Sequence, residues 1–333
     1  SVPIGFGTWT ETLTKARAQG SSTFGSDDTF DVYAYKVNGS TIKVVFNGDV
    51  VTYGTPTWTY TNTRYWDPSA TSYTFYAVSP SGVVSSSDVT PTTGAIAATN
   101  VTFNGNNSDI LVADQKNVTP TGSPATYSTS PVEMQFKHIA SLVDFKVKKH
   151  SDLTSATVAV TSFSITNIDN TGSFSVAEGY TTDVLSSVTW NATGRQTFTN
   201  NEGDGTAKHG VTEVTLPTNV TETASGDFLI NNLVIMPQTF RTAANSDSNV
   251  QAVNIDYTIT DAANNVGTYS TSFELKTFDD VDDTDNEDTL IGGWEAGKHY
   301  TFVITINANA ITFTGSVTPW TTTDTTGYHY LLN

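Results

Sequence analysis

Apolar and polar residues alternate along much of the chain with a period of two, the spacing of a β-strand with one buried face. The clearest run is residues 253–259, where Val, Ile and Tyr alternate with Asn, Asp and Thr. The same alternation predicts strands, each with one buried face, at residues 30–34, 42–46, 73–77, 143–147 and 302–306. Residues 228–236 are almost continuously apolar, which indicates a more central strand.

Turn signals separate these runs, and no helical pattern longer than two turns is present. Gly follows Asn at three of the signals: Asn38-Gly39, Asn47-Gly48 and Asn104-Gly105. Short strands separated by such turns are typical of β-sandwiches. The sequence therefore predicts an all-β protein.

The best candidate boundary between domains is residues 119–131, which hold three prolines, a glycine and many small polar residues. A long apolar segment, residues 132–147, follows it. We therefore predict two β-sandwich domains, residues 1–130 and 131–333, each large enough to bury a core. No repeat of about 20–50 residues is visible, which argues against a solenoid or a propeller.

The composition supports a folded, acidic β-protein. Hydrophobic residues make up 37% and charged residues 14%, and Thr, which suits the solvent face of a strand, is abundant. The net charge of −18 argues against binding to nucleic acid or to an anionic membrane surface. Because cysteine is absent, disulfides, cysteine-ligated zinc and thiol catalysis are excluded.

The start of the chain bears on its location. No apolar run approaches the roughly 18 residues of a membrane span. The sequence begins Ser1-Val2 without a methionine. A removed signal peptide that carried a lipidated cysteine would fit this start, and a chain shortened for other reasons would fit it equally.

The sequence contains no recognisable catalytic motif. The five histidines are scattered and include no pair at i, i+4, and no nucleophile elbow, Walker loop or dinucleotide fingerprint occurs. His138 lies in a strand-like segment, where a structural role is favoured. The many Asp and Glu residues leave a glycosidase-like carboxylate pair as a distant alternative. We predict no catalytic residues and no cofactor.

One acidic segment, residues 279–288, has the oxygen density of a calcium site. Its weak candidate ligands are Asp280, Asp282, Asp283 and Asp285. The segment lacks the central Gly and the terminal Glu spacing of an EF-hand loop. A solvated loop between two strands is the favoured interpretation, so no metal site is predicted.

Several local patterns stand out along the chain. The clearest is the sequence GWEAGKHYTF at residues 293–302, followed by VTPW at residues 317–320. The others are FDVYAY at 30–35, YWDP at 65–68, FYA at 75–77, FKHIASL at 136–142 and VIMPQ at 234–238. Together these patterns, in the expected order over nearly the whole chain, resemble the fimbrillin (Mfa-like, FimA-like) family of type V pilus subunits of Bacteroidales.

The resemblance implies a fold, a location and a way of assembling. The fold would be two tandem transthyretin-like Greek-key β-sandwiches. The protein would be exported as a lipoprotein through the outer membrane to the cell surface and would act in cell adhesion as part of a fimbrium. Its partners would be an arginine-specific protease, which removes a first strand, and other pilus subunits, which replace that strand by donor-strand exchange. The sequence does not identify an adhesion receptor.

The amino terminus has residues that fit this scheme. Arg17, which precedes Ala18, is one of four arginines and lies among small and polar residues suited to an exposed, cleavable loop. The removable segment would be about residues 1–17 of the first domain. In it, large side chains alternate with Pro or Gly, so that one strand face would carry Val2, Ile4 and Phe6. The alternative is an ordinary first strand that stays in place.

The carboxyl terminus also alternates. Tyr328, Tyr330 and Leu332 alternate with His329 and Leu331. This tail is interpreted as either a donor strand or a final pairing strand of the second domain. The sequence does not decide between a stalk, a tip and an anchor subunit.

The main alternative function is a cell-surface glycan-binding lipoprotein. Four aromatic residues close in sequence could form a sugar platform: Trp58, Tyr60, Tyr65 and Trp66. Clustered aromatic residues in a β-protein more often pack in the core or on a strand face. The pilus subunit is therefore preferred.

Overall fold

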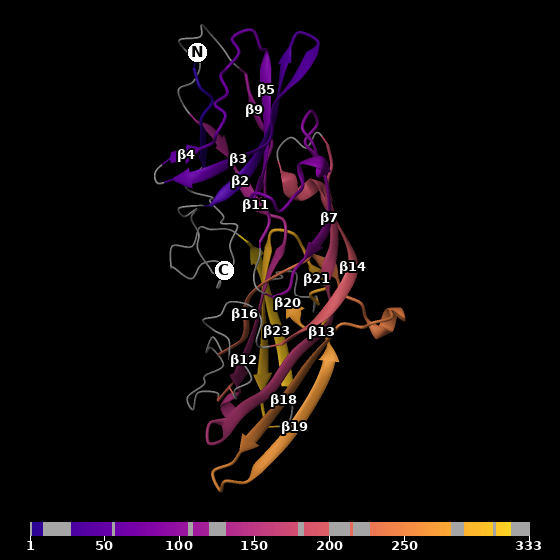
Figure 1. Cartoon of the computed structure of the whole chain (residues 1–333). Coiled ribbons are helices and arrows are strands. Elements are labelled where there is room, and N and C mark those ends of the chain that lie inside the picture. Colours follow the sequence, from indigo (N-terminus) through magenta and orange to yellow (C-terminus); the bar gives the residue numbers. More distant parts are fainter. Residues whose placement is uncertain are drawn as a thin grey trace.

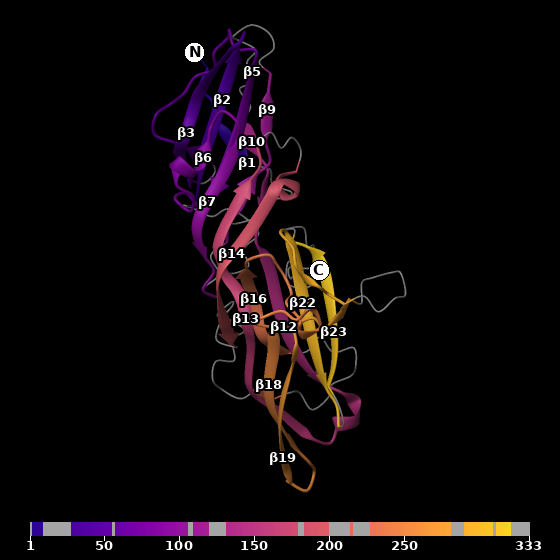
Figure 2. The same cartoon turned by 90° about the vertical axis from the view of Figure 1, so that its right-hand side faces the viewer.

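The structure, a computed structural model, is an elongated all-β molecule (Figures 1 and 2). It describes residues 2–8, 28–54, 57–105, 109–119, 131–178, 183–199, 214–215, 227–280, 290–308 and 311–320. Over these residues there is no α-helix, and none of the helical turns could cross a membrane. The helical turns are short 3₁₀ turns: η1 (Ser86–Asp88), η2 (Ser151–Leu153), η3 (Val184–Ser187) and η4 (Ala243–Asn245).

One end of the molecule is built by a seven-stranded sheet with the strand order β11-β8-β5-β2-β3-β4, in which β9 also pairs with β5. Its strands are β2 (Thr29–Asn38), β3 (Thr41–Gly54), β4 (Thr57–Thr59), β5 (Ser72–Ser79), β8 (Leu111–Ala113), β9 (Lys116–Val118) and β11 (Phe136–His138). Beside it, β1 (Phe6–Thr8) pairs in parallel with β10 (Val132–Met134). The division at residue 130 stays a prediction, and β10 and β11, just after it, pair with strands from before it.

Two further sheets face each other toward the other end. The first has the order β16-β12-β22-β23-β20, with the strands β12 (Ser141–Lys149), β16 (Asp227–Ile235), β20 (Asp279–Asp280), β22 (Lys298–Ile306) and β23 (Ile311–Pro319). The second has the order β19-β18-β13-β7-β6, with the strands β6 (Val89–Thr90), β7 (Ala95–Thr102), β13 (Thr157–Val176), β18 (Ala252–Thr260) and β19 (Val266–Glu274). Strands β14 (Val188–Thr199) and β15 (Val214–Thr215) also pair with β13, and β17 (Gln238–Thr239) pairs with β21 (Gly293–Trp294).

The 20-residue strand β13 is the longest strand described, and it pairs with β18, β7, β14 and β15. Its first half, residues 157–166, pairs with β18, and its second half, residues 171–176, pairs with β7. Between these stretches, on the same edge of β13, hydrogen bonds from two side chains take the place of backbone pairing, while β14 pairs with the other edge. The Gln238 amide accepts from the Asp169 N–H at 2.9 Å and donates to the Asp169 carbonyl at 3.0 Å, and Arg241 donates to the Asn167 carbonyl.

The buried side chains form two clusters. The amino-terminal core consists of Ile4, Phe6, Phe30, Val32, Ala34, Phe46, Val51, Trp58, Trp66, Ala70, Tyr73, Phe75, Ala77, Leu111, Ala113, Val132, Met134 and Phe136. The main core contains inward side chains of β12, β13, β16, β18 and β22. Strand β2 lies between the two, because its opposite face contributes Tyr33 to the main core.

The predicted strand with alternating burial at residues 253–259 is confirmed for its first part: Val253, Ile255 and Tyr257 are buried within β18. The alternation predicted for β3 is wrong. Phe46 is fully buried, whereas Ile42 and Val44 are 52% and 48% exposed. The reason is a bulge: Ala34 pairs with Phe46 but the next residue, Tyr35, pairs with Val44, so Val44 and Phe46 face opposite sides.

Gly48 shows a second correction. We predict a turn at Asn47-Gly48, but both residues lie inside β3 at another shift of register. Gly48 has φ +83°, a conformation that glycine adopts at little cost, so the signal marks a bulge. The turn predicted at Asn38-Gly39 is confirmed, because it joins β2 to β3 and Gly39 has φ +61°.

Candidate functional site

The candidate site is the groove that holds residues 2–8, whose backbone is hydrogen-bonded on both edges. On one edge, the Ile4 N–H donates to the Arg64 carbonyl at 2.9 Å, and the Val2 carbonyl accepts from the Trp66 N–H at 3.0 Å. On the other edge, the Gly5 carbonyl accepts from the Val132 N–H at 2.8 Å, and the parallel pairing of β1 with β10 continues from there. The segment is therefore a central strand between two walls that are distant in sequence.

The inward side chains of this segment are part of the amino-terminal core. Ile4 is 1% exposed and Phe6 is 4% exposed, and Val2 packs partly buried against the same core. Burying a large apolar side chain contributes about 1.5–3 kcal/mol. Ile4 and Phe6 thus help to stabilise this end of the molecule.

Phe6 lies in a cage of aromatic rings. Its ring centroid is 5.4 Å from that of Phe46, 5.6 Å from Tyr60, 6.0 Å from Phe30 and 6.1 Å from Phe75. All four pairs meet edge to face, the arrangement that the quadrupoles of aromatic rings favour. We call Phe30, Phe46, Tyr60 and Phe75 the aromatic cage.

Tyr60 and Arg64 fix the backbone of the bound segment. The Tyr60 hydroxyl donates to the Ile4 carbonyl at 2.6 Å and accepts from the Arg64 N–H at 3.2 Å, and burial raises the pKa of Tyr60. The Arg64 side chain donates to the Val45 carbonyl and to Asp49, each at 3.1 Å. The wall that contacts Ile4 is therefore tied to β3.

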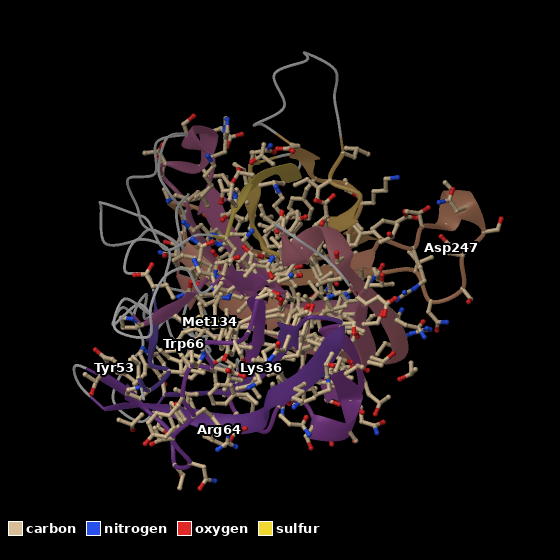
Figure 3. The ribbon with its side chains drawn as sticks, turned by 90° about the horizontal axis from the view of Figure 1, so that it is seen from above. Lys36, Tyr53, Arg64, Trp66, Met134 and Asp247 are labelled. Carbon is tan, nitrogen blue, oxygen red and sulfur yellow. The ribbon has the colours of Figure 1, made fainter. Side chains whose placement is uncertain are left out.

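Seen from this end of the molecule, Trp66 and Met134 lie toward the middle and Arg64 lies at the rim (Figure 3). Trp66 belongs to one wall of the groove and Met134 to the other, and both are buried in the amino-terminal core. Neither the hydroxyl of Tyr60 nor the backbone carbonyl of Arg64 is predicted from the sequence as a contact of the first strand. The sequence singles out Tyr65 and Trp66 as part of a resemblance motif and of the glycan-binding alternative, and not as a wall for the first strand.

The outward face of the segment is made of small residues. Gly5 and Gly7 face Pro131, the residue just before β10. A Cβ atom built on Gly7 would lie 3.2 Å from the Pro131 Cβ, whereas a Cβ on Gly5 would lie 4.0 Å from the Pro131 Cα. Space on this face is therefore tighter at residue 7 than at residue 5.

Two groups of sequence-predicted site residues lie outside the described residues. These are Arg17 and Ala18, and Tyr328, Tyr330 and Leu332. The described chain ends at Trp320, whose N–H donates to the Gly297 carbonyl at 2.7 Å. The Trp320 ring stacks on His138 at a centroid distance of 3.5 Å and an interplanar angle of 6°. The position from which the carboxyl-terminal tail starts is thus fixed to β11.

Two histidines are buried with aspartate partners. His138 is hydrogen-bonded to Asp109, whose pKa is raised by burial. His299 is hydrogen-bonded to Asp144 at 2.6 Å, and Asp144 also accepts from the Asn232 N–H at 2.6 Å, beside a shift in the β12–β16 register. His299 and Asp144 lie within β22 and β12, and His138 and Asp109 are buried at the end of β11, so the structural role predicted for His138 agrees with its surroundings.

The described residues contain no group of three or more His, Asp or Glu placed to hold a metal ion. Of the weak calcium candidates, Asp280 lies in β20, which pairs in parallel with β23. The other three, Asp282, Asp283 and Asp285, lie outside the described residues.

The aromatic residues of the glycan-binding alternative do not form a platform. Trp58 and Trp66 are 9% and 6% exposed within the amino-terminal core, and Tyr60 packs against that core. Tyr65 alone of the four is largely exposed, at 53%. Their main role is packing, and three of them lie within or beside the groove.

Comparison with known proteins is consistent with this architecture. The family model described as fimbrillin-like matches residues 14–320. A crystal structure of a fimbrial protein from Bacteroides vulgatus has a TM-score of 0.53 at 16% sequence identity and covers 96% of this chain and 99% of that chain. The tip fimbrial protein Mfa3 from Porphyromonas gingivalis, with a carboxyl-terminal truncation, has a TM-score of 0.39 at 10% identity, covering 89% and 95%. No curated protein matches the sequence.

Proposed function

Since the chain belongs to the fimbrillin-like family, we propose that it is a structural and adhesive pilus subunit that acts by polymerising with other subunits. Assembly proceeds by exchange of the first strand for a strand of a neighbouring subunit. The protein has no catalytic role and no cofactor. It works at the cell surface in the fimbrium, after export through the outer membrane as a lipoprotein.

The observation that carries this proposal is the way residues 2–8 are held. They form a central strand between the walls at residues 64–66 and 132–134, with Ile4 and Phe6 in the core. Loss of the segment would leave backbone donors and acceptors unpaired on both walls and open an apolar groove. A strand from a second subunit would pair with the backbone of both walls, which provides affinity. Its side chains would fill the apolar groove, which provides specificity.

The proposed trigger is cleavage between Arg17 and Ala18 by an arginine-specific protease. The other three arginines lie in described strands or loops, and two of them have bound side chains: Arg64 donates to Asp49, and Arg241 donates to Asp169 at 2.8 Å. Arg195 forms a longer ion pair with Asp169, at 3.7 Å. Cleavage requires a chain that can extend through the protease active site, which the contacts of Arg64 and Arg241 and the strand pairing of Arg195 oppose.

The strand offered to the next subunit is the carboxyl-terminal tail, with Tyr328, Tyr330 and Leu332 on its inserting face. Trp320, stacked on His138, anchors the start of this tail. A fixed start shortens the free length of the tail and so reduces the conformational entropy lost on insertion.

Limited digestion with an arginine-specific protease tests the proposal. We expect mass spectrometry to show cleavage after Arg17, and size-exclusion chromatography to show the release of residues 1–17 and the growth of oligomers once other pilus subunits are added. The Arg17→Lys variant keeps the positive charge but should resist the protease and stay monomeric. A cleaved protein that keeps its first strand and stays monomeric would rule out this mode of assembly.

A further inference from the structure

We propose that the groove selects its incoming strand by two adjacent positions: an aromatic side chain in the place of Phe6 and a side chain no larger than a methyl group in the place of Gly7. The occupant is a strand of a different pilus subunit with the pattern aliphatic, small, aromatic, small, as in Ile4-Gly5-Phe6-Gly7. This proposal rests on the proposed function and names the partner strand of the same groove.

The aromatic requirement follows from the shape of the aromatic cage. The four rings surround Phe6 at centroid distances between 5.4 and 6.1 Å, with interplanar angles between 66° and 90°. Each ring therefore meets the Phe6 ring through an edge-to-face contact that a planar side chain provides and an aliphatic one does not. A small side chain in this place would leave a cavity in the amino-terminal core.

The small-residue requirement follows from Pro131. The 3.2 Å separation between a Cβ on Gly7 and the Pro131 Cβ is shorter than ordinary van der Waals contact, and the Pro131 Cγ would lie at 3.7 Å. Proline is a rigid ring without rotamers that could move aside. The next residue, Val132, is hydrogen-bonded to the Gly5 carbonyl, so Pro131 cannot withdraw without weakening that bond.

The register of the strand is fixed independently of these side chains. The Tyr60 hydroxyl and the Val132 N–H bind the carbonyls of two successive residues, Ile4 and Gly5, from opposite edges. A strand that forms both hydrogen bonds places its next two residues in the aromatic cage and against Pro131. Adjacent residues of a strand point to opposite faces, and the aromatic cage and Pro131 lie on opposite faces of this strand. The groove therefore selects an adjacent pair of residues.

The tail of an identical copy fits this pair poorly. When it runs in the direction of residues 2–8 with Tyr328 or Tyr330 in the aromatic cage, His329 or Leu331 stands against Pro131. When Leu332 occupies the cage, Tyr330 must fill the place of Ile4, which is 1% exposed. The chain thus receives its strand from a different kind of subunit, while its own tail is offered to a different groove.

Peptide exchange tests the proposal without altering the protein. The full chain is cut after Arg17 and incubated with a labelled peptide of residues 1–10, and unlabelled peptides then compete for the groove. The Gly5→Val and Gly7→Val peptides are matched, because both add the same branched side chain to the same strand face. We expect the Gly5→Val peptide to compete within about threefold of the natural sequence and the Gly7→Val peptide to compete about tenfold less well or worse.

Two more peptides test the cage and the source of the strand. The Phe6→Ala peptide should compete about a hundredfold less well than the natural sequence, and a peptide of residues 326–333 should not compete at all. Equal competition by the Gly7→Val and Gly5→Val peptides would overturn the role of Pro131, and efficient competition by the tail peptide would overturn the choice of a different subunit. If even the natural sequence fails to enter the cut protein, strand exchange itself is wrong.

Discussion

Single residues hold the groove walls in position before any strand arrives. Arg64 is the clearest case, because its backbone carbonyl accepts from Ile4 and its guanidinium binds β3 through Val45 and Asp49. Its guanidinium carbon also lies 5.7 Å from the centroid of the Phe46 ring, a member of the aromatic cage. Of these contacts of Arg64, departure of the first strand removes only the one to Ile4. The contacts to Val45, Asp49 and Phe46 can therefore keep this wall in place.

Asp67 fixes the chain just after that wall and makes the stability of the folded protein depend on pH. Its backbone N–H donates to the Tyr73 hydroxyl at 2.7 Å, and its carboxylate accepts from Lys36 at 2.7 Å and from the Ser69 N–H at 2.9 Å. The hydrogen bond from Lys36, with those from Ser69, holds the pKa of Asp67 well below its ordinary value. The ionised form is therefore favoured in the folded protein.

A lowered carboxyl pKa stabilises the fold above the unfolded-state pKa of about 3.9, and this contribution is lost as the pH falls through the folded pKa. We predict that Asp67→Asn has a lower melting temperature than the unchanged chain at pH 7, and that the difference shrinks below about pH 4. Thermal unfolding between pH 2 and pH 7 measures this. A difference that stays constant over that range would contradict the prediction. Lys36→Gln should show the same trend, because it removes the partner instead.

At the scale of elements, β13 depends on side chains where its strand partners change. Gln238 supplies a donor and an acceptor to the backbone of Asp169, and Arg241 binds both the Asp169 carboxylate and the Asn167 carbonyl. The Gln238 carbonyl oxygen also accepts from Gln251 at 2.6 Å. This polar group of side chains bonds the edge of β13 that lies between its β18 and β7 stretches, while β14 pairs with the opposite edge.

We predict that Gln238→Leu lowers the free energy of unfolding by about 2–4 kcal/mol, because it leaves two backbone groups and the Gln251 amide without their partner. Unfolding in urea, followed by far-ultraviolet circular dichroism, measures the change. Thr239→Val is the matched control in the same short strand, since Thr239 is exposed, and it should change the free energy by less than about 0.5 kcal/mol. Equal effects of the two substitutions would contradict the role given to Gln238.

The sequence allowed the strands to be predicted better than their partners. Alternation is a local signal, so it marked the buried face of β18. It located β2 but not its burial, because both faces of residues 30–34 are buried, and it failed in β3 because a bulge reverses the faces without changing the composition. Pairing is not local: Ile4 meets Arg64 and Val132, and Asp144 meets His299 across 155 residues. For the groove, large residues alternating with glycine made the first strand recognisable. The contacts of Tyr60 and Pro131 with that strand could not be predicted, because they join residues that are distant in sequence.

For the whole molecule, the separation of the two cores determines how far loss of the first strand is felt. Ile4 and Phe6 belong to the amino-terminal core and do not belong to the main core. Strand β2 is shared by both, since Phe30 and Val32 face one core and Tyr33 faces the other. A cut subunit can therefore keep the main core intact while the groove in its amino-terminal core is open to a new strand.

We predict that cleavage after Arg17 and loss of the first segment increase amide hydrogen exchange at residues 64–66 and 132–134, which lose their backbone partners. Exchange in β18 and β22 should stay unchanged, because these strands pair and pack within the main core. Hydrogen exchange with mass spectrometry, before and after cleavage, measures both. A rise spread evenly along the chain would show that the two cores unfold together.

The long strand β13 has a mechanical consequence for such a subunit. At about 3.3 Å per residue, its 20 residues extend over roughly 66 Å, and it runs along the long axis of the part of the molecule that the two facing sheets form (Figure 1). Tension along that direction loads its hydrogen bonds in shear, so the bonds share the force and must break together. In a fibre pulled by flowing liquid, β13 would then carry load along the two facing sheets of each subunit, and Gln238 and Arg241 would hold the point where its strand partners change.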